Sequence, residues 1–130
     1  RNMTPGKAAL RDGSTFYNLT SNVDNTHIEV SLDRPMPAGV RLAVSLTSTL
    51  GRSSGWVDVT RAGRDLAVVT GMSRGLENGQ SISFQLEVDG AVERLDLEDR
   101  LLTITVVDPV SRTSHTSYQS IQFGVLPETR

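Results

Sequence analysis

Cysteine is absent from this chain of 130 residues, so it can form neither disulfide bonds nor thiolate metal sites. A single domain is expected at this length. Such a chain buries roughly two-thirds of its unfolded surface, which is enough for a hydrophobic core without cross-links. The lack of cysteine therefore leaves the redox compartment open.

An excess of one charge and long apolar runs are also missing. The 13 basic and 15 acidic side chains give a formal net charge of −2 and form no basic stripe. Domains that bind nucleic acid usually carry such a stripe, so nucleic acid is not expected as a partner. No apolar stretch approaches the roughly 20 residues of a transmembrane helix, so no membrane-spanning segment is expected in this chain.

Alternation of apolar and polar residues is the main signal that is present. It points one face of a strand inward and the other to solvent. It is strongest at 40–46, 82–88, 102–106 and 121–125, and weaker at 16–20, 27–32, 56–60, 66–70 and 91–97. Residues 92–102 fit either a helical turn or a strand followed by a bend, and the strand is favoured.

Turn-forming residues separate these segments. Pro35, Pro37 and Gly39 precede one strand, Asn78-Gly79 introduces another, and Asp89-Gly90 matches a type I′ turn. Short strands spaced roughly 8–15 residues apart are typical of a sandwich or barrel. We therefore predict an all-β fold, an antiparallel two-sheet sandwich with immunoglobulin-like topology and about 7–9 strands.

The domain boundary is expected near residue 14. Residues 1–13 contain Pro5, Gly6 and Gly13 and show no clear alternation, so they are expected to form a flexible or partner-docked N-terminal arm. Residues 14–130 would then form a single β-sandwich domain.

One motif resembles a catalytic one. Gly51, Ser53 and Gly55 match G-x-S-x-G, the nucleophile elbow of α/β hydrolases, and Asp65 and His115 follow in a plausible order. The motif requires a sharp strand-to-helix turn, whereas the residues that follow it here read as a strand. A glycine-serine loop explains the match at 51–55 better, so we expect no catalytic residues and no enzyme.

Two groups of residues are candidates for a ligand. Asp96, Glu98 and Asp99 could supply oxygens to calcium, although solvated loop carboxylates are the simpler interpretation. Trp56, the sole tryptophan, shares a strand face with Asp58, and its ring could stack on a sugar. Burial of Trp56 in the core is equally compatible with the sequence, and no other cofactor is expected.

The order of the strands and turns carries a resemblance, which runs through 17–22, 28–32, 36–42, 68–71 and 102–105. This order resembles bacterial extracytoplasmic domains with immunoglobulin-like topology, over most of residues 14–108. The resemblance implies a secreted or surface-exposed structural module, such as a pilus, coat or envelope component. The paired cysteines often found in such subunits are absent here.

These observations predict a non-catalytic structural or assembly module of a bacterial envelope, surface appendage or coat. Its expected location is extracytoplasmic, in the periplasm or at the cell surface, and its expected partners are proteins, including copies of itself. The arm at 1–13 would add a strand to the edge of a neighbour's sheet. A viral decoration or coat protein belongs to the same class. The alternative is a ligand-binding β-sandwich module for carbohydrate or calcium.

Overall fold

Alternating residues form nine strands in the computed structural model, which describes residues 7–89, 95–110 and 114–125. Each strong alternating segment of the sequence lies within one of them. The strands are β1 (Lys7–Ser21), β2 (Thr26–Leu32), β3 (Val40–Leu46), β4 (Arg52–Ser53), β5 (Val57–Asp58), β6 (Leu66–Met72), β7 (Gly75–Asp89), β8 (Leu95–Val107) and β9 (Ser114–Val125).

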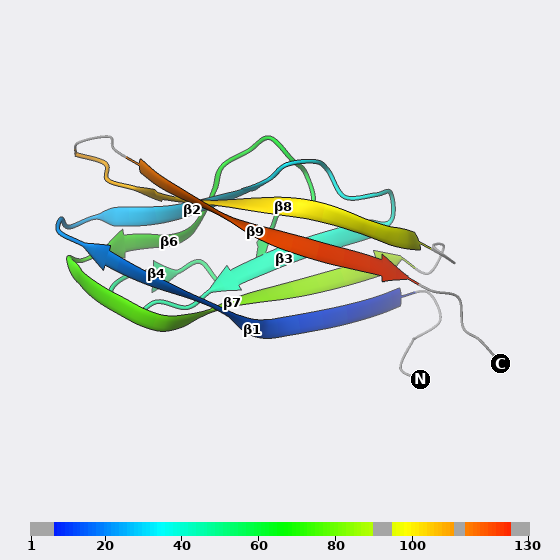
Figure 1. Cartoon of the computed structure of the whole chain (residues 1–130), viewed down its shortest axis with the longest axis horizontal. Coiled ribbons are helices and arrows are strands. Elements are labelled where there is room, and N and C mark those ends of the chain that lie inside the picture. The colour runs from blue at the N-terminus through cyan, green and yellow to red at the C-terminus, as the bar shows by residue number, and fades with distance from the viewer. Residues whose placement is uncertain (1–6, 90–94, 111–113, 126–130) are drawn as a thin grey trace.

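The strands form two antiparallel sheets that pack face to face (Figure 1). The four-stranded sheet has the order β1-β7-β3-β5, and the five-stranded sheet has the order β4-β6-β2-β8-β9. The predicted all-β, two-sheet sandwich is therefore confirmed.

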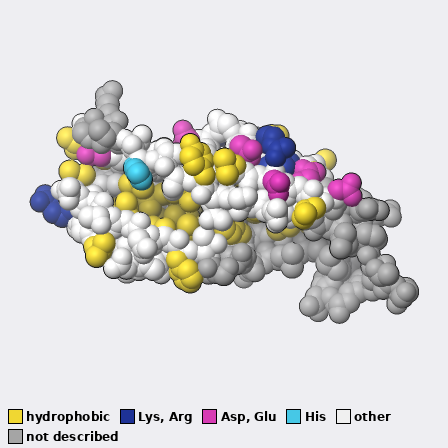
Figure 2. All heavy atoms as spheres, viewed as in Figure 1, with side chains coloured by type: hydrophobic (Ala, Val, Ile, Leu, Met, Phe, Trp, Pro, Cys, Tyr) yellow, Lys and Arg dark blue, Asp and Glu magenta, His cyan; other side chains and the backbone are white. Residues whose placement is uncertain are grey.

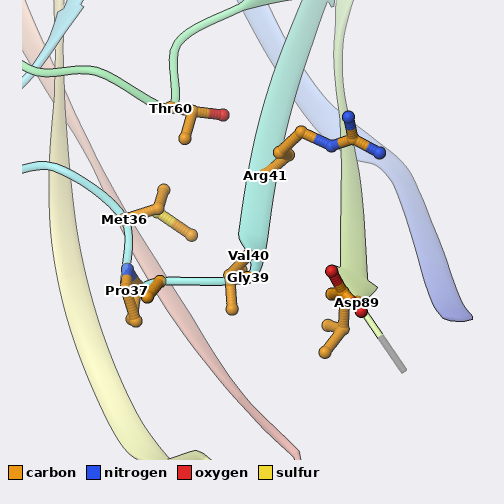
Figure 3. Close-up of a pocket in the computed structure, with 9 residues that line it drawn as sticks. Met36, Pro37, Gly39, Val40, Arg41, Thr60 and Asp89 are labelled. Carbon is orange, nitrogen blue, oxygen red and sulfur yellow. The ribbon is translucent and has the colours of Figure 1, made fainter. Parts of the chain in front are cut away.

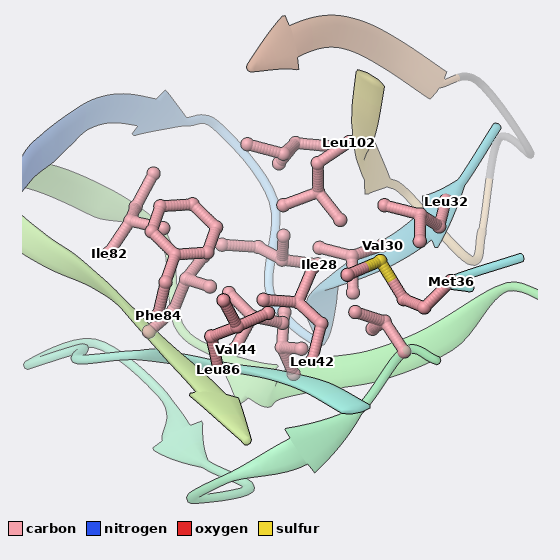
Figure 4. Packing of buried hydrophobic residues seen from close by; sticks show 14 of the residues in the cluster. Ile28, Val30, Leu32, Met36, Leu42, Val44, Ile82, Phe84, Leu86 and Leu102 are labelled. Carbon is pink, nitrogen blue, oxygen red and sulfur yellow. The ribbon is translucent and has the colours of Figure 1, made fainter. Parts of the chain in front are cut away.

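The core lies between the two sheets, and strand register explains its composition. In β3 and β7, Val44 pairs with Phe84 and Leu42 with Leu86, and all four side chains are buried. Paired residues project to the same face of a sheet, so these rows form one continuous apolar surface. The facing sheet supplies a similar surface from β2 and β8, and Figure 4 shows the two interdigitating.

Consecutive strands mostly lie in different sheets. From β1 to β8, every connection passes from one sheet to the other, and only β8 and β9 are both consecutive and paired. The Asp89-Gly90 turn signal therefore does not join two neighbouring strands of one sheet. Gly90 itself lies outside the described residues.

The structure places the start of the sandwich earlier than predicted. Residues 7–13, assigned to an arm by the sequence, belong to β1, where Lys7 pairs with Asp89 and Leu10 with Leu86. Between Asp12 and Thr15 the register shifts by one residue, which marks a β-bulge. This bulge interrupts the alternation from which the strand could have been predicted. Residues 1–6 lie outside the described part of the chain.

Candidate functional site

The edge strands β1 and β9 border one side of the sandwich. Each is the last strand of its sheet, β1 beside β7 and β9 beside β8, and both lie near the viewer in Figure 1. Across the described residues, neither strand has a backbone ladder on its outer edge. No described residue therefore pairs with the outward N–H and C=O groups of these two strands, and groups of this kind can form a ladder with an added strand.

A groove of about 600 Å³ lies between these two edges. Figure 2 shows hydrophobic side chains gathered in a hollow on this face, surrounded by uncharged polar side chains and backbone. The β1 side of the groove includes Leu19, and its interior includes Thr26 and Val106. Ser114 and His115 line it from β9.

The exposure of β9 shows where the two sheets separate. Residues 114–118 are all exposed, so neither face of this half of the strand is covered. Ser117 pairs with the buried Ile104 of β8, and its side chain therefore points inward between the sheets. Further along the same row, Ile121 is half-buried and Phe123 is buried. The sandwich is thus closed at the Phe123 end and open at the His115 end.

A buried carboxylate lies on β7 at the position paired with Leu19 of the groove. Glu77 of β7 is only 1% exposed and accepts hydrogen bonds from the Thr49 backbone N–H at 2.8 Å, the Thr49 hydroxyl at 2.6 Å and the Ser48 hydroxyl. Burial raises the pKa of the Glu77 carboxyl, but the hydrogen bonds from Ser48, Thr49 and the Leu50 backbone outweigh it and hold the pKa below its ordinary value. The carboxylate therefore ties the 48–50 loop to β7.

Tyr17 completes this attachment from β1. Its hydroxyl donates a hydrogen bond of 2.6 Å to the carbonyl oxygen of Thr47. Burial, together with the nearby negative charge of Glu77, raises the pKa of Tyr17 to about 12. The phenol thus stays protonated at neutral pH and remains a donor.

A second bulge bends the β1–β7 pair at the groove. Tyr17 pairs with Gln80 and Leu19 with Glu77, so β7 contains an extra residue at this point. Gly79 takes a φ of 63°, and its N–H donates to the Asn18 side-chain oxygen at 2.7 Å. Counting back from Ile82 by twos would point Glu77 outward, and the extra residue turns it inward instead.

The G-x-S-x-G segment forms no nucleophile elbow. Ser53 lies in β4 at one edge of the five-stranded sheet, and His115 lies in β9 at the other, with three strands between them. At about 4.8 Å per strand, that separation is roughly 19 Å, far beyond hydrogen-bond reach. A Cβ at Gly51 would lie 2.6 Å from Met72 Cγ, so close packing explains this glycine. The Ser53 hydroxyl accepts a hydrogen bond from Gly55 N–H, as in an ordinary loop.

The calcium candidates do not converge. Asp99 points to the opposite face of β8 from Glu98, and a register irregularity between Leu95 and Glu98 separates Asp96 from both. Glu98 pairs with the buried Arg100 at 2.9 Å. In the parts of the chain that the structure describes, no group of three or more His, Asp or Glu side chains could hold a metal ion.

The carbohydrate candidates do come together. Trp56 is 45% exposed, whereas the neighbouring Val59 is buried, so the valine face of this segment packs inward. Trp56 and Asp58 line one hollow of about 340 Å³ on the outer face of the four-stranded sheet. Trp56 is therefore a surface residue and not part of the core.

No family model, curated protein or solved structure matches this chain. No helix of the described residues has the length and apolar character needed to cross a membrane. Any function must therefore be argued from the geometry of the chain itself.

Sequence reasoning missed the groove for a physical reason. The alternation at 121–125 predicted only the end of β9, because residues 114–120 carry polar or exposed side chains on both faces. A strand whose inner face is uncovered has no need for apolar residues there. The polar inward row of β9, which contains His115 and Ser117, is itself the signal of an open edge.

Proposed function

We propose that this chain is a non-catalytic assembly module that joins neighbouring copies of itself by strand addition. One observation carries the proposal: the groove between β1 and β9 combines the apolar side chains of Leu19, Val23 and Val106 with two strand edges that no described residue pairs. An extended segment from a neighbour could form backbone hydrogen bonds with either edge and place alternate side chains in the groove.

The length of the two edges supports this proposal. β1 spans 15 residues and β9 spans 12. Long exposed edges promote aggregation, and proteins that stay monomeric shorten them, cover them or place charges on them. The described side chains of β9 from Ser114 to Phe123 include no Lys, Arg, Asp or Glu. An edge without such protection is suited to pairing with another chain.

The wider setting of the module is part of the same proposal. The order of strands and turns resembles bacterial extracytoplasmic domains with immunoglobulin-like topology. We accordingly assign the chain to an envelope, surface appendage or coat, in the periplasm or on the cell surface. The lack of cysteine is compatible with such a setting because the core is large enough without disulfides.

A matched pair of substitutions on β9 tests the proposal. Ser117 and Ser120 are both exposed, and they project to opposite faces of the same strand. Ser117→Lys places a charge on the inward face of β9, two residues beyond the groove residue His115, where it must be desolvated when a strand enters between the sheets. Ser120→Lys places the same charge on the outer face of the sheet.

Sedimentation velocity at increasing protein concentration provides the measurement. We expect wild type and Ser120→Lys to associate and Ser117→Lys to remain monomeric, with all three giving the same circular dichroism spectrum. Equal association of the two lysine variants would refute strand addition in the groove. A wild-type protein that stays monomeric at every concentration would refute self-assembly as a whole.

A further inference from the structure

Trp56 forms one wall of a shallow hollow on the outer face of the four-stranded sheet. The hollow has a volume of about 340 Å³, and Ala43 and Gln85 also line it. Ala43 lies between Asp58 of β5 and Gln85 of β7 in one cross-strand row. Its methyl side chain is much smaller than its neighbours, which explains why the surface is depressed there.

The polar groups around this ring are arranged in a fixed geometry. Arg41 pairs with Glu87 at 3.1 Å, and one Asp58 oxygen accepts a hydrogen bond from the Thr60 backbone N–H at 2.8 Å. These contacts hold a guanidinium and two carboxylates at the rim of the hollow. A flat aromatic face beside oriented donors and acceptors can bind a sugar ring, which has apolar C–H faces and equatorial hydroxyls.

A second hollow, of about 460 Å³, adjoins the first and shares Arg41 and Asp58 with it. Arg61 and Arg64 line this second hollow. Neither arginine makes a hydrogen bond or ion pair within the described residues, which span 7–89, 95–110 and 114–125. Guanidinium groups bind carboxylates through paired hydrogen bonds, so these side chains are suited to an anionic group.

A third hollow, of about 530 Å³, continues on the other side of Arg41. Figure 3 shows Arg41 extending from β3 toward β7, with Met36, Pro37 and Thr60 on the opposite side of β3 and Asp89 at the end of β7. Thr60 lines both this hollow and the one that contains Arg61. The three hollows therefore surround Arg41, and a ligand of more than one ring could extend through them.

We propose that this face binds an acidic oligosaccharide, with one sugar ring on Trp56 and the carboxylate of a neighbouring uronic acid unit between Arg61 and Arg64. The volumes of the hollows lie within the range of about 300–1,000 Å³ typical of ligand sites. This site shares no lining residue with the groove between β1 and β9.

Because Trp56 is the sole tryptophan, its fluorescence reports on this site alone. The probes are oligogalacturonate and the same oligosaccharide with its carboxylates methyl-esterified, which removes the charge and keeps the rings. Oligogalacturonate should change the emission in a saturable way, and its affinity should fall as salt is added. The methyl ester should bind about tenfold more weakly or worse, because the charged hydrogen bonds are lost.

Calorimetry of variants then tests which side chains bind the ring and which bind the carboxylate. Arg64→Gln should weaken oligogalacturonate binding about tenfold and leave methyl-ester binding unchanged. Arg52→Gln is the matched control, since Arg52 is exposed and lines none of the three hollows. Trp56→Ala should weaken both ligands, whereas Trp56→Phe should retain part of the affinity.

Three results would overturn the proposal. They are an emission unchanged by either ligand, equal affinity for the acid and the ester, and equal effects of Arg64→Gln and Arg52→Gln. None of these results bears on assembly through β9, so the two proposals succeed or fail separately.

Discussion

At the residue scale, the polar groups that matter for the fold are buried and fully paired. Arg100 is 6% exposed, and its guanidinium donates twice to the Pro35 carbonyl, at 3.1 and 2.9 Å, and pairs with Glu98. No buried side-chain N or O atom in the described part of the chain lacks a hydrogen-bond partner. Such groups cost stability when one partner is removed, because the other is left desolvated.

Glu77 gives the clearest prediction at this scale. Glu77→Gln should lower the free energy of unfolding by about 1–3 kcal/mol, because an amide nitrogen replaces one oxygen that accepts hydrogen bonds. The control Glu29→Gln alters a half-buried contact with His27 at 2.9 Å and should cost less than about 1 kcal/mol. Urea denaturation measures both, and equal losses would contradict the role assigned to Glu77.

The lowered pKa of the Glu77 carboxyl determines how its contribution to the free energy of unfolding depends on pH. The folded-state pKa of Glu77 lies below its ordinary value of 4.5, so the unfolded chain takes up the proton first as the pH falls. The contribution of Glu77 is therefore present above that value and is lost as the pH falls through the folded pKa. In urea titrations from about pH 7 to about pH 3, the free energy of unfolding should fall less steeply for Glu77→Gln than for wild type.

A buried glutamate at this position could not be foreseen from the sequence. The alternation from Ile82 to Val88 is regular, and its extension backward assigns Glu77 to the outer face. The bulge at Gly79 reverses that assignment by inserting one residue. The sequence predicts a turn at Asn78-Gly79 before the strand, whereas the structure places both residues at a bulge within β7.

At the element scale, prediction succeeded where a strand has two unlike faces. β2, β3 and the second half of β7 are buried on one side only, and their alternation placed them correctly. β5 has only two residues but lies within the weaker alternating segment at 56–60, whereas β4, also of two residues, is too short to show any period. The first halves of β1 and β9 were missed, because β1 carries a bulge and β9 an uncovered inner face.

The Gly79 bulge gives a prediction at this scale. A Cβ at Gly79 would meet no atom within 4 Å, so a substitution there acts through the backbone φ of 63° alone. Gly79→Ala should lower the free energy of unfolding by about 1 kcal/mol, and Gly79→Asn by less, since asparagine tolerates this conformation better. Thermal and urea unfolding of the three proteins give the ranking. A Gly79→Ala protein as stable as wild type would contradict the bulge.

At the scale of the whole molecule, the sequence indicated two sheets but not which strand joins which. Turn residues reverse the chain equally well within a sheet and between sheets, so the Asp89-Gly90 signal could not show that β7 and β8 belong to different sheets. The open side between β1 and β9 follows from that topology. Local sequence patterns therefore could not predict this open side. The proposed assembly through β1 and β9 depends on it.

Amide hydrogen exchange, compared between dilute and concentrated protein, is the decisive test of assembly through β1 and β9 because it locates the surface on which copies meet. Strand addition should slow exchange at high concentration in residues 15–21 of β1 and 114–119 of β9, where a neighbour's strand supplies new backbone hydrogen bonds. Arg52 and Ser53, at the far edge of the five-stranded sheet, should exchange at the same rate in both samples. Slowing confined to β4, β5 or the outer faces of the sheets, or no slowing at all, would contradict assembly through β1 and β9.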